Sequence, residues 1–253
     1  MPLQSLKRPL LQFKFEVRSL LAREEWLAPF HKPVIWWTQH KNKGIIDVRE
    51  CAVDDTTELV IDGFQGSGNS FATVAFKRSQ ETPVRLAHHL HSPAQIIKSA
   101  RKKLPTLITI REPKGAAISL VSRWPYVSLT QAVRGYIHFY EKIEPYAGSF
   151  VISPFHLTTR QLDLVIREVN HRHGTDFGVF EYDESEMQIL RGSEKLNSEA
   201  EVQRSALKKK MGEEFDRVVD PALFKKAQEV YARIEKHSFD KHSTLPQSSE
   251  VGN

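Results

Sequence analysis

The sequence predicts a three-layer α/β fold with a central parallel β-sheet flanked by helices. Over residues 58–155, short apolar segments alternate with helix-like segments, a pattern typical of parallel strands joined by crossover helices. The 253 residues are enough to bury one sizeable core and fit a single α/β domain with terminal extensions. With 40% hydrophobic and 26% charged residues, the composition is that of a folded protein rather than a disordered or fibrous one.

Residues 1–57 are predicted to form an N-terminal helix and a lead-in segment. Apolar residues recur at helical spacing over residues 5–30, so we expect one amphipathic helix. These positions are Leu10, Phe13, Val17, Leu20, Leu21 and Leu27. The basic face could lie on an anionic membrane, although packing against its own domain is the commoner use of such a helix. Pro33 is expected to end the helix, with a short strand or a packed loop over residues 34–38.

The α/β domain is predicted over residues 58–237. Four apolar segments are expected to be its strands, at residues 59–63, 84–88, 107–110 and 150–152. Helices are expected at residues 70–77, 93–103, 115–123, 129–142, 159–173 and 221–237. Residues 198–210 are polar and basic, and form either a mobile loop or a surface helix. The Ser-rich residues 238–253 are predicted to be a disordered tail.

Cysteine content and charge narrow the class of protein. Cys51 is the single cysteine, so no internal disulfide is possible, and no Cys/His set has the spacing of a zinc site. A reducing, cytoplasmic compartment is the simplest fit, because charges interrupt every apolar stretch that could form a signal peptide or a membrane span. The net charge of +5 favours an anionic partner, which nucleic acid, acidic lipid or nucleotide phosphates would all satisfy.

The strongest local signal is a glycine-rich turn between the first strand and its helix. It reads Gly63-Phe64-Gln65-Gly66-Ser67-Gly68-Asn69-Ser70. Glycines let backbone N–H groups converge on one point, and a helix N-terminus adds a dipole that favours phosphate. The turn nearly matches the phosphate loop G-x-x-x-x-G-K-[ST], with Asn69 at the lysine position, so the fold is predicted to be of the P-loop type. Without that lysine, and without an Asp to hold Mg²⁺, ATP or GTP hydrolysis fits poorly.

A second signal follows the third strand. It reads Arg111-Glu112-Pro113-Lys114-Gly115-Ala116-Ala117-Ile118-Ser119. Ligands of open α/β sheets gather at the carboxyl edge of the strands. Arg111 is suited to bidentate phosphate contact, and Ser119 could donate from the helix that follows. The alternative is a surface arginine and a helix serine that bind nothing.

Taken together, the two signals resemble the motifs of the sulfotransferases that use 3′-phosphoadenosine 5′-phosphosulfate (PAPS). Residues 63–71 resemble the family's 5′-phosphosulfate loop, usually G-Y-P-K-S-G-T-T-W. Residues 111–119 resemble its 3′-phosphate motif, usually R-D-P-R-D-x-x-x-S, with the Arg-to-Ser spacing kept. The resemblance covers residues 59–153.

The resemblance implies that PAPS is the co-substrate and that no metal takes part. It implies that Arg111 and Ser119 bind the 3′-phosphate, and that the 5′ end is bound by Gly66, Ser67, Gly68, Asn69, Ser70 and Phe71. Of the family's late glycine-rich nucleotide loop, only Arg191-Gly192 offers a fragment. The implied reaction is in-line transfer of a sulfuryl group to a hydroxyl or amine of a carbohydrate, lipid or small molecule.

Three histidines at the end of the second strand are the candidates for the catalytic base. The strand ends in Leu86-Ala87-His88-His89-Leu90-His91. Adjacent strand residues point to opposite faces, so His88 and His89 are not expected to share one role. In the family this strand often ends in K-T-H-L-P, which places His89 at the catalytic position. His91 is the next choice, and a purely structural role is the alternative for each of the three.

Two cations of the family pattern are missing, which keeps other functions open. The family's loop lysine falls on Gly66, and the lysine before its histidine falls on Ala87. A catalytically degenerate nucleotide-binding protein is therefore the alternative to an active sulfotransferase, and a P-loop kinase or NTPase is a third. The expected partners are the nucleotide and a hydroxyl-bearing acceptor rather than nucleic acid, with possible peripheral membrane contact through the N-terminal helix.

Overall fold

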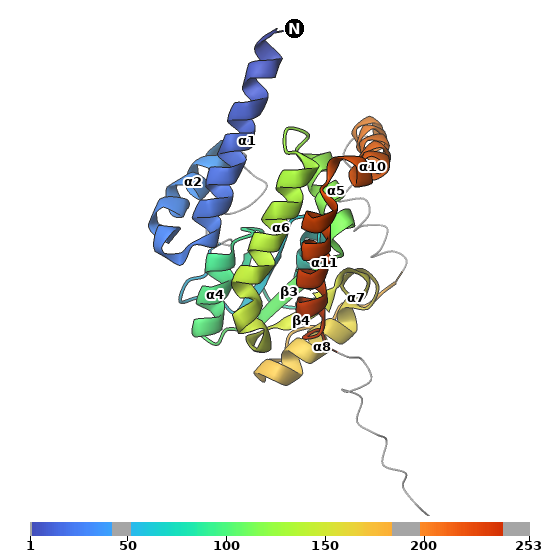
Figure 1. The fold of residues 1–253 in the computed structure, drawn as a ribbon. Coiled ribbons are helices and arrows are strands. Elements are labelled where there is room, and N and C mark those ends of the chain that lie inside the picture. Colours follow the sequence, from blue (N-terminus) through green and yellow to red (C-terminus); the bar gives the residue numbers. More distant parts are fainter. Residues whose placement is uncertain (1, 42–51, 184–197, 240–253) are drawn as a thin grey trace, which may run out of the picture.

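A computed structural model describes residues 2–41, 52–183 and 198–239. Four parallel strands form one sheet in the order β2-β1-β3-β4, and Figure 1 shows β3 and β4 of this sheet with helices around them. The strands are β1 (Leu59–Gly63), β2 (Leu86–His88), β3 (Thr106–Ile110) and β4 (Val151–Pro154). The predicted α/β architecture with a parallel sheet flanked by helices is thus confirmed. Cys51, Arg191 and residues 240–253 lie outside the described residues.

Helices cover both faces of the sheet. One face packs against α3 (Asn69–Arg78), α7 (Phe155–Arg160) and α8 (Leu162–His173). The other packs against α4 (Pro93–Arg101), α5 (Pro113–Arg123), α6 (Leu129–Ile143) and α11 (Pro221–Glu235). A short 3₁₀ helix, η3 (Glu144–Ser149), leads into β4. Each strand is buried on both sides, which explains the near-continuous apolar segments in the sequence.

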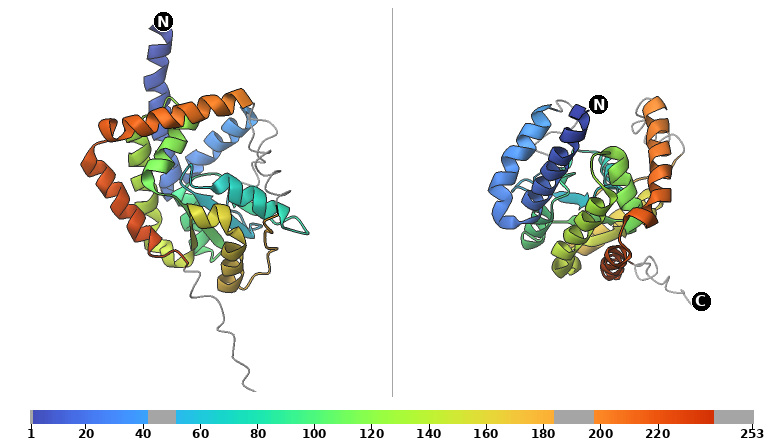
Figure 2. Two further views of the ribbon diagram at one scale, coloured as in Figure 1. Left: turned by 90° about the vertical axis from the view of Figure 1, so that its right-hand side faces the viewer. Right: turned by 45° about the horizontal axis from the view of Figure 1, so that its top comes forward.

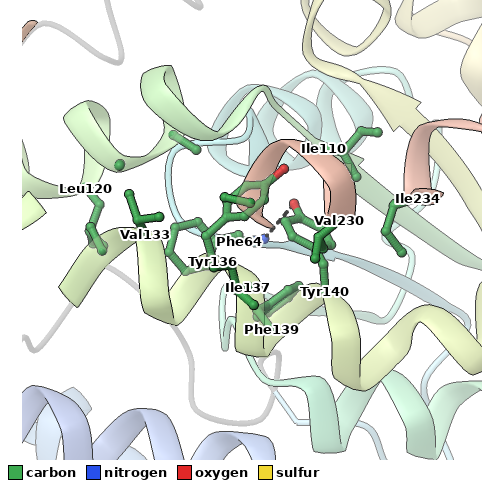
Figure 3. Close-up of a cluster of buried hydrophobic side chains, with 14 of the residues drawn as sticks. Phe64, Ile110, Leu120, Val133, Tyr136, Ile137, Phe139, Tyr140, Val230 and Ile234 are labelled. Atoms are coloured by element: carbon green, nitrogen blue, oxygen red, sulfur yellow. Dashed lines mark hydrogen bonds between the residues drawn. The ribbon is translucent and has the colours of Figure 1, made fainter. Parts of the chain in front are cut away.

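The core under α6 is rich in aromatic side chains. Phe64, Tyr136, Phe139 and Tyr140 pack edge to face or tilted against one another (Figure 3). Because Phe64 belongs to the glycine-rich turn, this cluster ties the turn to α6.

The N-terminal segment differs from the prediction. Instead of one helix over residues 5–30, α1 (Pro2–Arg23), a 3₁₀ turn η1 (Glu25–Leu27) and α2 (Ala28–Lys41) follow one another. Glu24 has extended dihedral angles (φ −93°, ψ 122°), and its carboxylate accepts hydrogen bonds from Arg23 and Lys142. The break is therefore fixed by an ion pair with α6, 118 residues away.

Pro33 does not end a helix either. It lies inside α2, and residues 34–38 are helical rather than a strand or a loop. As the sixth residue of α2, Pro33 lies past the first four positions, whose N–H groups have no intrahelical partner, so α2 continues through it with one intrahelical hydrogen bond absent.

The C-terminal half shows two further differences. The helix expected over residues 159–173 is interrupted at Gln161 and becomes α7 and α8. The first N–H of α8, from Leu162, donates to the hydroxyl of Tyr182 (2.6 Å), a partner 20 residues away that the sequence pattern does not reveal. Residues 198–210, left open as loop or helix, belong to α10 (Ser198–Val218), which packs on α5.

The packed chain extends slightly past residue 237. Ser238 bridges to Ile152 of β4, and Phe239 is buried against the α3–α8 face. Among the described helices, none has the length and apolar character needed to cross a bilayer.

Candidate functional site

The glycine-rich turn forms a tight loop at the carboxyl end of β1. Gly66 and Gly68 both have left-handed dihedral angles (φ 85° and 103°), which glycine adopts without a steric cost. Gly68 is the N-cap of α3, so the backbone passes from the loop directly into the first turn of the helix. The N–H groups of Gly68, Asn69 and Ser70 donate to no other group in the described part of the chain. These three donors belong to the start of α3, where the helix dipole favours an anion.

Two side chains of the loop face the protein interior rather than the site. Asn69 is buried: its Nδ2 donates to the carbonyls of Gly63 (3.3 Å) and Phe64 (3.1 Å), and its Oδ1 accepts from Thr109 Oγ1 (2.7 Å). Ser67 Oγ is also buried, 3.4 Å from the Tyr140 hydroxyl. Any anion would thus meet the backbone of these residues, not their side chains.

Tyr140 holds the loop against the sheet from the side of α6. Its hydroxyl donates to the carbonyl of Thr109 in β3 (3.1 Å) and accepts from the N–H of Phe64 (3.4 Å; Figure 3). Burial raises the pKa of Tyr140, so the hydroxyl keeps its proton and remains a donor. The sequence pattern does not reveal Tyr140 as a site residue, because it lies 76 residues from Phe64 in the chain.

The structure brings Arg111, Ser119 and Gly66 together. Arg111 Nη1 donates to the carbonyl of Gly66 at 3.2 Å. A Cβ built on Gly66 would lie 2.7 Å from Ser119 Cβ and 2.9 Å from its Oγ, so the loop and α5 are in direct contact there. The two sequence motifs therefore meet at one residue, although 45 positions separate Gly66 from Arg111.

Arg111 is half buried and has no carboxylate partner within ion-pair distance in the described part of the chain. Its guanidinium lies over the ring of Phe155, 4.2 Å from the centroid, and burial lowers its pKa while nearby Glu112 opposes that shift. Glu112 instead caps α5 by accepting from the N–H of Gly115 (2.6 Å). A desolvated cation without an acidic partner is costly, and an anionic ligand would offset that cost.

The same edge of the sheet carries the three histidines. His89 Nε2 lies 3.1 Å from Ser70 Oγ, and His89 Nδ1 lies 2.7 Å from His88 Nδ1. His91 Nδ1 donates to the carbonyl of Gly63 (2.8 Å), while its N–H donates to the buried carboxylate of Asp62 (3.2 Å). The alternation of strand side chains, on which the separate roles of His88 and His89 were expected to rest, does not extend to His89: β2 ends at His88, His89 turns back with a left-handed φ of 59°, and the two rings lie edge to face.

The surroundings of His89 lower its pKa, which affects how well it can act as a base. Burial, followed by the neighbouring His91, His88, Arg123 and Lys77, lowers the pKa of His89 to about 2. The ring is therefore neutral near pH 7, with a lone pair available, but it is a weak proton acceptor. An anion bound beside it would favour the protonated form and raise this pKa.

Two predicted site residues remain, one that packs in the core and one that lies outside the described residues. Phe71 packs against Phe180 in the core rather than lining the loop, and Arg191 lies outside the described residues. Phe155 was not foreseen, yet it lies under Arg111 and within 3.4 Å of a Cβ built on Gly68. In the described ranges, no group of three or more His, Cys, Asp or Glu side chains is placed to hold a metal ion.

Comparison with known proteins gives no match: no family model, no curated protein and no solved structure is similar to this chain at a significant level. The site must be interpreted from its own geometry.

Proposed function

We propose that the chain is a P-loop-type nucleotide-binding protein and a sulfotransferase. In this proposal it binds PAPS and transfers the sulfuryl group to a hydroxyl or amine. The observation that carries the proposal is the contact of Arg111 and Ser119 with Gly66. An arginine without an acidic partner and a serine beside a glycine-rich loop suit a nucleotide that carries a phosphate at each end.

The backbone would bind the 5′ end of the nucleotide. The N–H groups of Gly68, Asn69 and Ser70 make no other hydrogen bond among the described residues, and the dipole of α3 reinforces them. During transfer, the sulfur–oxygen bond to the 5′-phosphate breaks while a new one forms to the acceptor oxygen. These donors would stabilise the charge that develops on the leaving phosphate oxygen.

His89 would take the proton that the acceptor loses. Its contact with Ser70 Oγ (3.1 Å) places it at the start of α3, next to the predicted phosphosulfate position. Charge on the bound phosphosulfate would raise its depressed pKa toward the range in which histidine acts as a base.

A second candidate is a nucleotide-binding protein that does not transfer sulfate. Two observations favour it: the left-handed, crowded Gly66 leaves no room for the family's loop lysine, and the pKa of His89 is far below neutral. The ligand would be the same, and only the chemistry would differ.

Calorimetric titration with 3′,5′-adenosine bisphosphate, with ATP and Mg²⁺ as the comparison, tests the shared nucleotide site. We expect selective binding of the bisphosphate. Arg111→Ala should weaken it by about tenfold or more, because a hydrogen bond to a charged group is lost, and should affect ATP less. Arg134→Ala, a change at an exposed arginine of α6, is the matched control. If the bisphosphate does not bind, both proposed functions are wrong.

The release of bisphosphate from PAPS separates the two candidates. Acceptor-dependent release that His89→Ala abolishes, with nucleotide affinity retained, supports the transferase. Tight binding without release across an acceptor screen supports the non-catalytic alternative.

A further inference from the structure

Helix α1 has two apolar faces, and the structure buries the one that the sequence pattern did not single out. Phe15 and Ala22 face the domain, at 7% and 5% exposure. Of the six apolar positions that predict the amphipathic helix, four point outward: Phe13 is 66% exposed, and Leu10, Val17 and Leu20 are each more than a third exposed. At 100° per residue, positions 10, 13, 17 and 20 share one side of the helix, opposite Phe15 and Ala22.

Two further large apolar side chains are exposed in the elements that follow α1. Trp26 in η1 and Phe30 in α2 are 74% and 64% exposed. We call Leu10, Phe13, Val17 and Leu20 the α1 stripe. The first turns of α1 project beyond the other elements in Figures 1 and 2, so this end of the stripe is reachable by a large partner.

Exposed cations without carboxylate partners lie on the same N-terminal segment as the α1 stripe, with Lys7 and Lys14 next to the stripe on α1. Lys7, Arg8, Lys14 and Lys32 are exposed, and no carboxylate of the described residues lies within ion-pair distance of them. The segment has three acidic residues, of which exposed Glu16 accepts a hydrogen bond from Gln131 Nε2 (2.9 Å) and the other two form ion pairs. Glu24 pairs with Arg23 and Lys142, and Glu25 with Arg101.

We propose that the α1 stripe and its cations dock on the surface of an anionic lipid bilayer, with α1 lying in the interface. An exposed apolar stripe next to Lys and Arg is the pattern of an interfacial helix, and exposed Trp and Phe side chains suit the headgroup level. Cations near an anionic leaflet are attracted to its surface. The helix does not satisfy the requirements for crossing the bilayer.

Charge decides between a lipid surface and a second copy of the chain. Helix α1 carries Lys7, Arg8, Lys14, Arg18 and Arg23 against the single acidic residue Glu16, so two copies that met through their α1 stripes would bring two net positive helices together, and like charges at close range oppose association. An anionic surface offers these cations a favourable partner while covering the apolar side chains.

Sedimentation of the full chain with phosphatidylcholine vesicles, with and without phosphatidylglycerol, tests the proposal. We expect the protein to sediment with the anionic vesicles, to be released by high salt, and to bind neutral vesicles weakly. The triple change Leu10→Ser, Phe13→Ser and Leu20→Ser should weaken binding by roughly tenfold or more. Lys7→Ala, Arg8→Ala and Lys14→Ala together should remove the preference for the anionic lipid.

The control is Val202→Ser with Val218→Ser, which removes exposed apolar side chains from α10 and should leave vesicle binding unchanged. Urea denaturation of each variant shows that the fold is intact. Three results would overturn the proposal: no vesicle binding, equal binding by the stripe variant, or a concentration-dependent dimer in analytical ultracentrifugation that the stripe variant abolishes. All three are independent of nucleotide binding.

Discussion

At Gly66, the difference between this chain and the family pattern has a steric cause. The residue has a left-handed φ of 85°, and Ser119 occupies the space that a Cβ would take. The close packing of the loop on α5 therefore leaves no room for a side chain at this position, and the lysine of the sulfotransferase pattern that the sequence resembles could not be introduced there by substitution alone.

Gly66→Ala should destabilise the protein by about 1–3 kcal/mol, because a non-glycine residue at positive φ is strained and its Cβ would press on Ser119. Gly148→Ala is the control: its added Cβ meets no atom within 4 Å, so we expect a change of less than about 0.5 kcal/mol. Urea denaturation measures both. Equal stabilities would contradict the close contact between the loop and α5.

His89 should make the stability of the fold dependent on pH. Its pKa is lowered to about 2 in the folded state, mainly by burial, whereas an unfolded histidine titrates near 6.5. The unfolded state therefore binds more protons below pH 6.5, and this stabilising contribution is lost as the pH falls from about 6.5 toward 2. His31, whose pKa burial lowers to about 4, acts in the same direction.

Urea denaturation at pH 7.5 and 5.5 tests this expectation. We expect the free energy of unfolding to fall by about 1 kcal/mol for each of these histidines over this interval. His89→Gln, which can still hydrogen-bond Ser70, should reduce the fall, while His156→Gln, at an exposed position of α7, should not. An unchanged pH dependence in the His89 variant would show that its ring is not buried in the neutral form.

At the scale of elements, α6 organises the site although it contributes no predicted site residue. Tyr140 links the helix to the loop and to β3, and a capping box of Ser128 and Gln131 fixes the start of the helix. The loop is thus supported by a helix that begins 66 residues after β1 ends, which a local motif cannot show.

Tyr140→Phe should destabilise the protein by about 1–3 kcal/mol, because the buried N–H of Phe64 loses its acceptor. It should also weaken bisphosphate binding, since the loop is less firmly held. Tyr146→Phe removes a hydroxyl that contacts only the exposed Arg101, and should cost less than about 0.5 kcal/mol. Thermal unfolding and calorimetry measure the two effects, and equal behaviour of the two variants would exclude Tyr140 as the support of the loop.

At the scale of the whole molecule, residues that follow α11 are part of the packed core. Phe239 packs against the α3–α8 face, and its N–H donates to the carbonyl of Ile152 in β4 (3.4 Å). The chain therefore contributes to the core after α11, past the boundary that the Ser-rich composition suggested.

Phe239→Ala should cost about 3 kcal/mol, because a large buried ring is replaced by a cavity. Phe30→Ala, at a 64% exposed ring, should change stability by less than about 0.5 kcal/mol. Guanidinium denaturation compares them. A neutral Phe239→Ala would place the end of the packed domain before this residue.

The sequence by itself determined the α/β architecture, because buried strands must be apolar and crossover helices amphipathic. It also determined the strand–loop–helix at residues 59–78, whose glycines carry local conformational information. The tertiary structure decided the rest: that Arg111 and Ser119 meet Gly66, that Asn69 and Ser67 face inward, and which side of α1 is buried. These outcomes depend on contacts between segments tens of residues apart, and helical periodicity shows that an apolar face exists without showing what covers it.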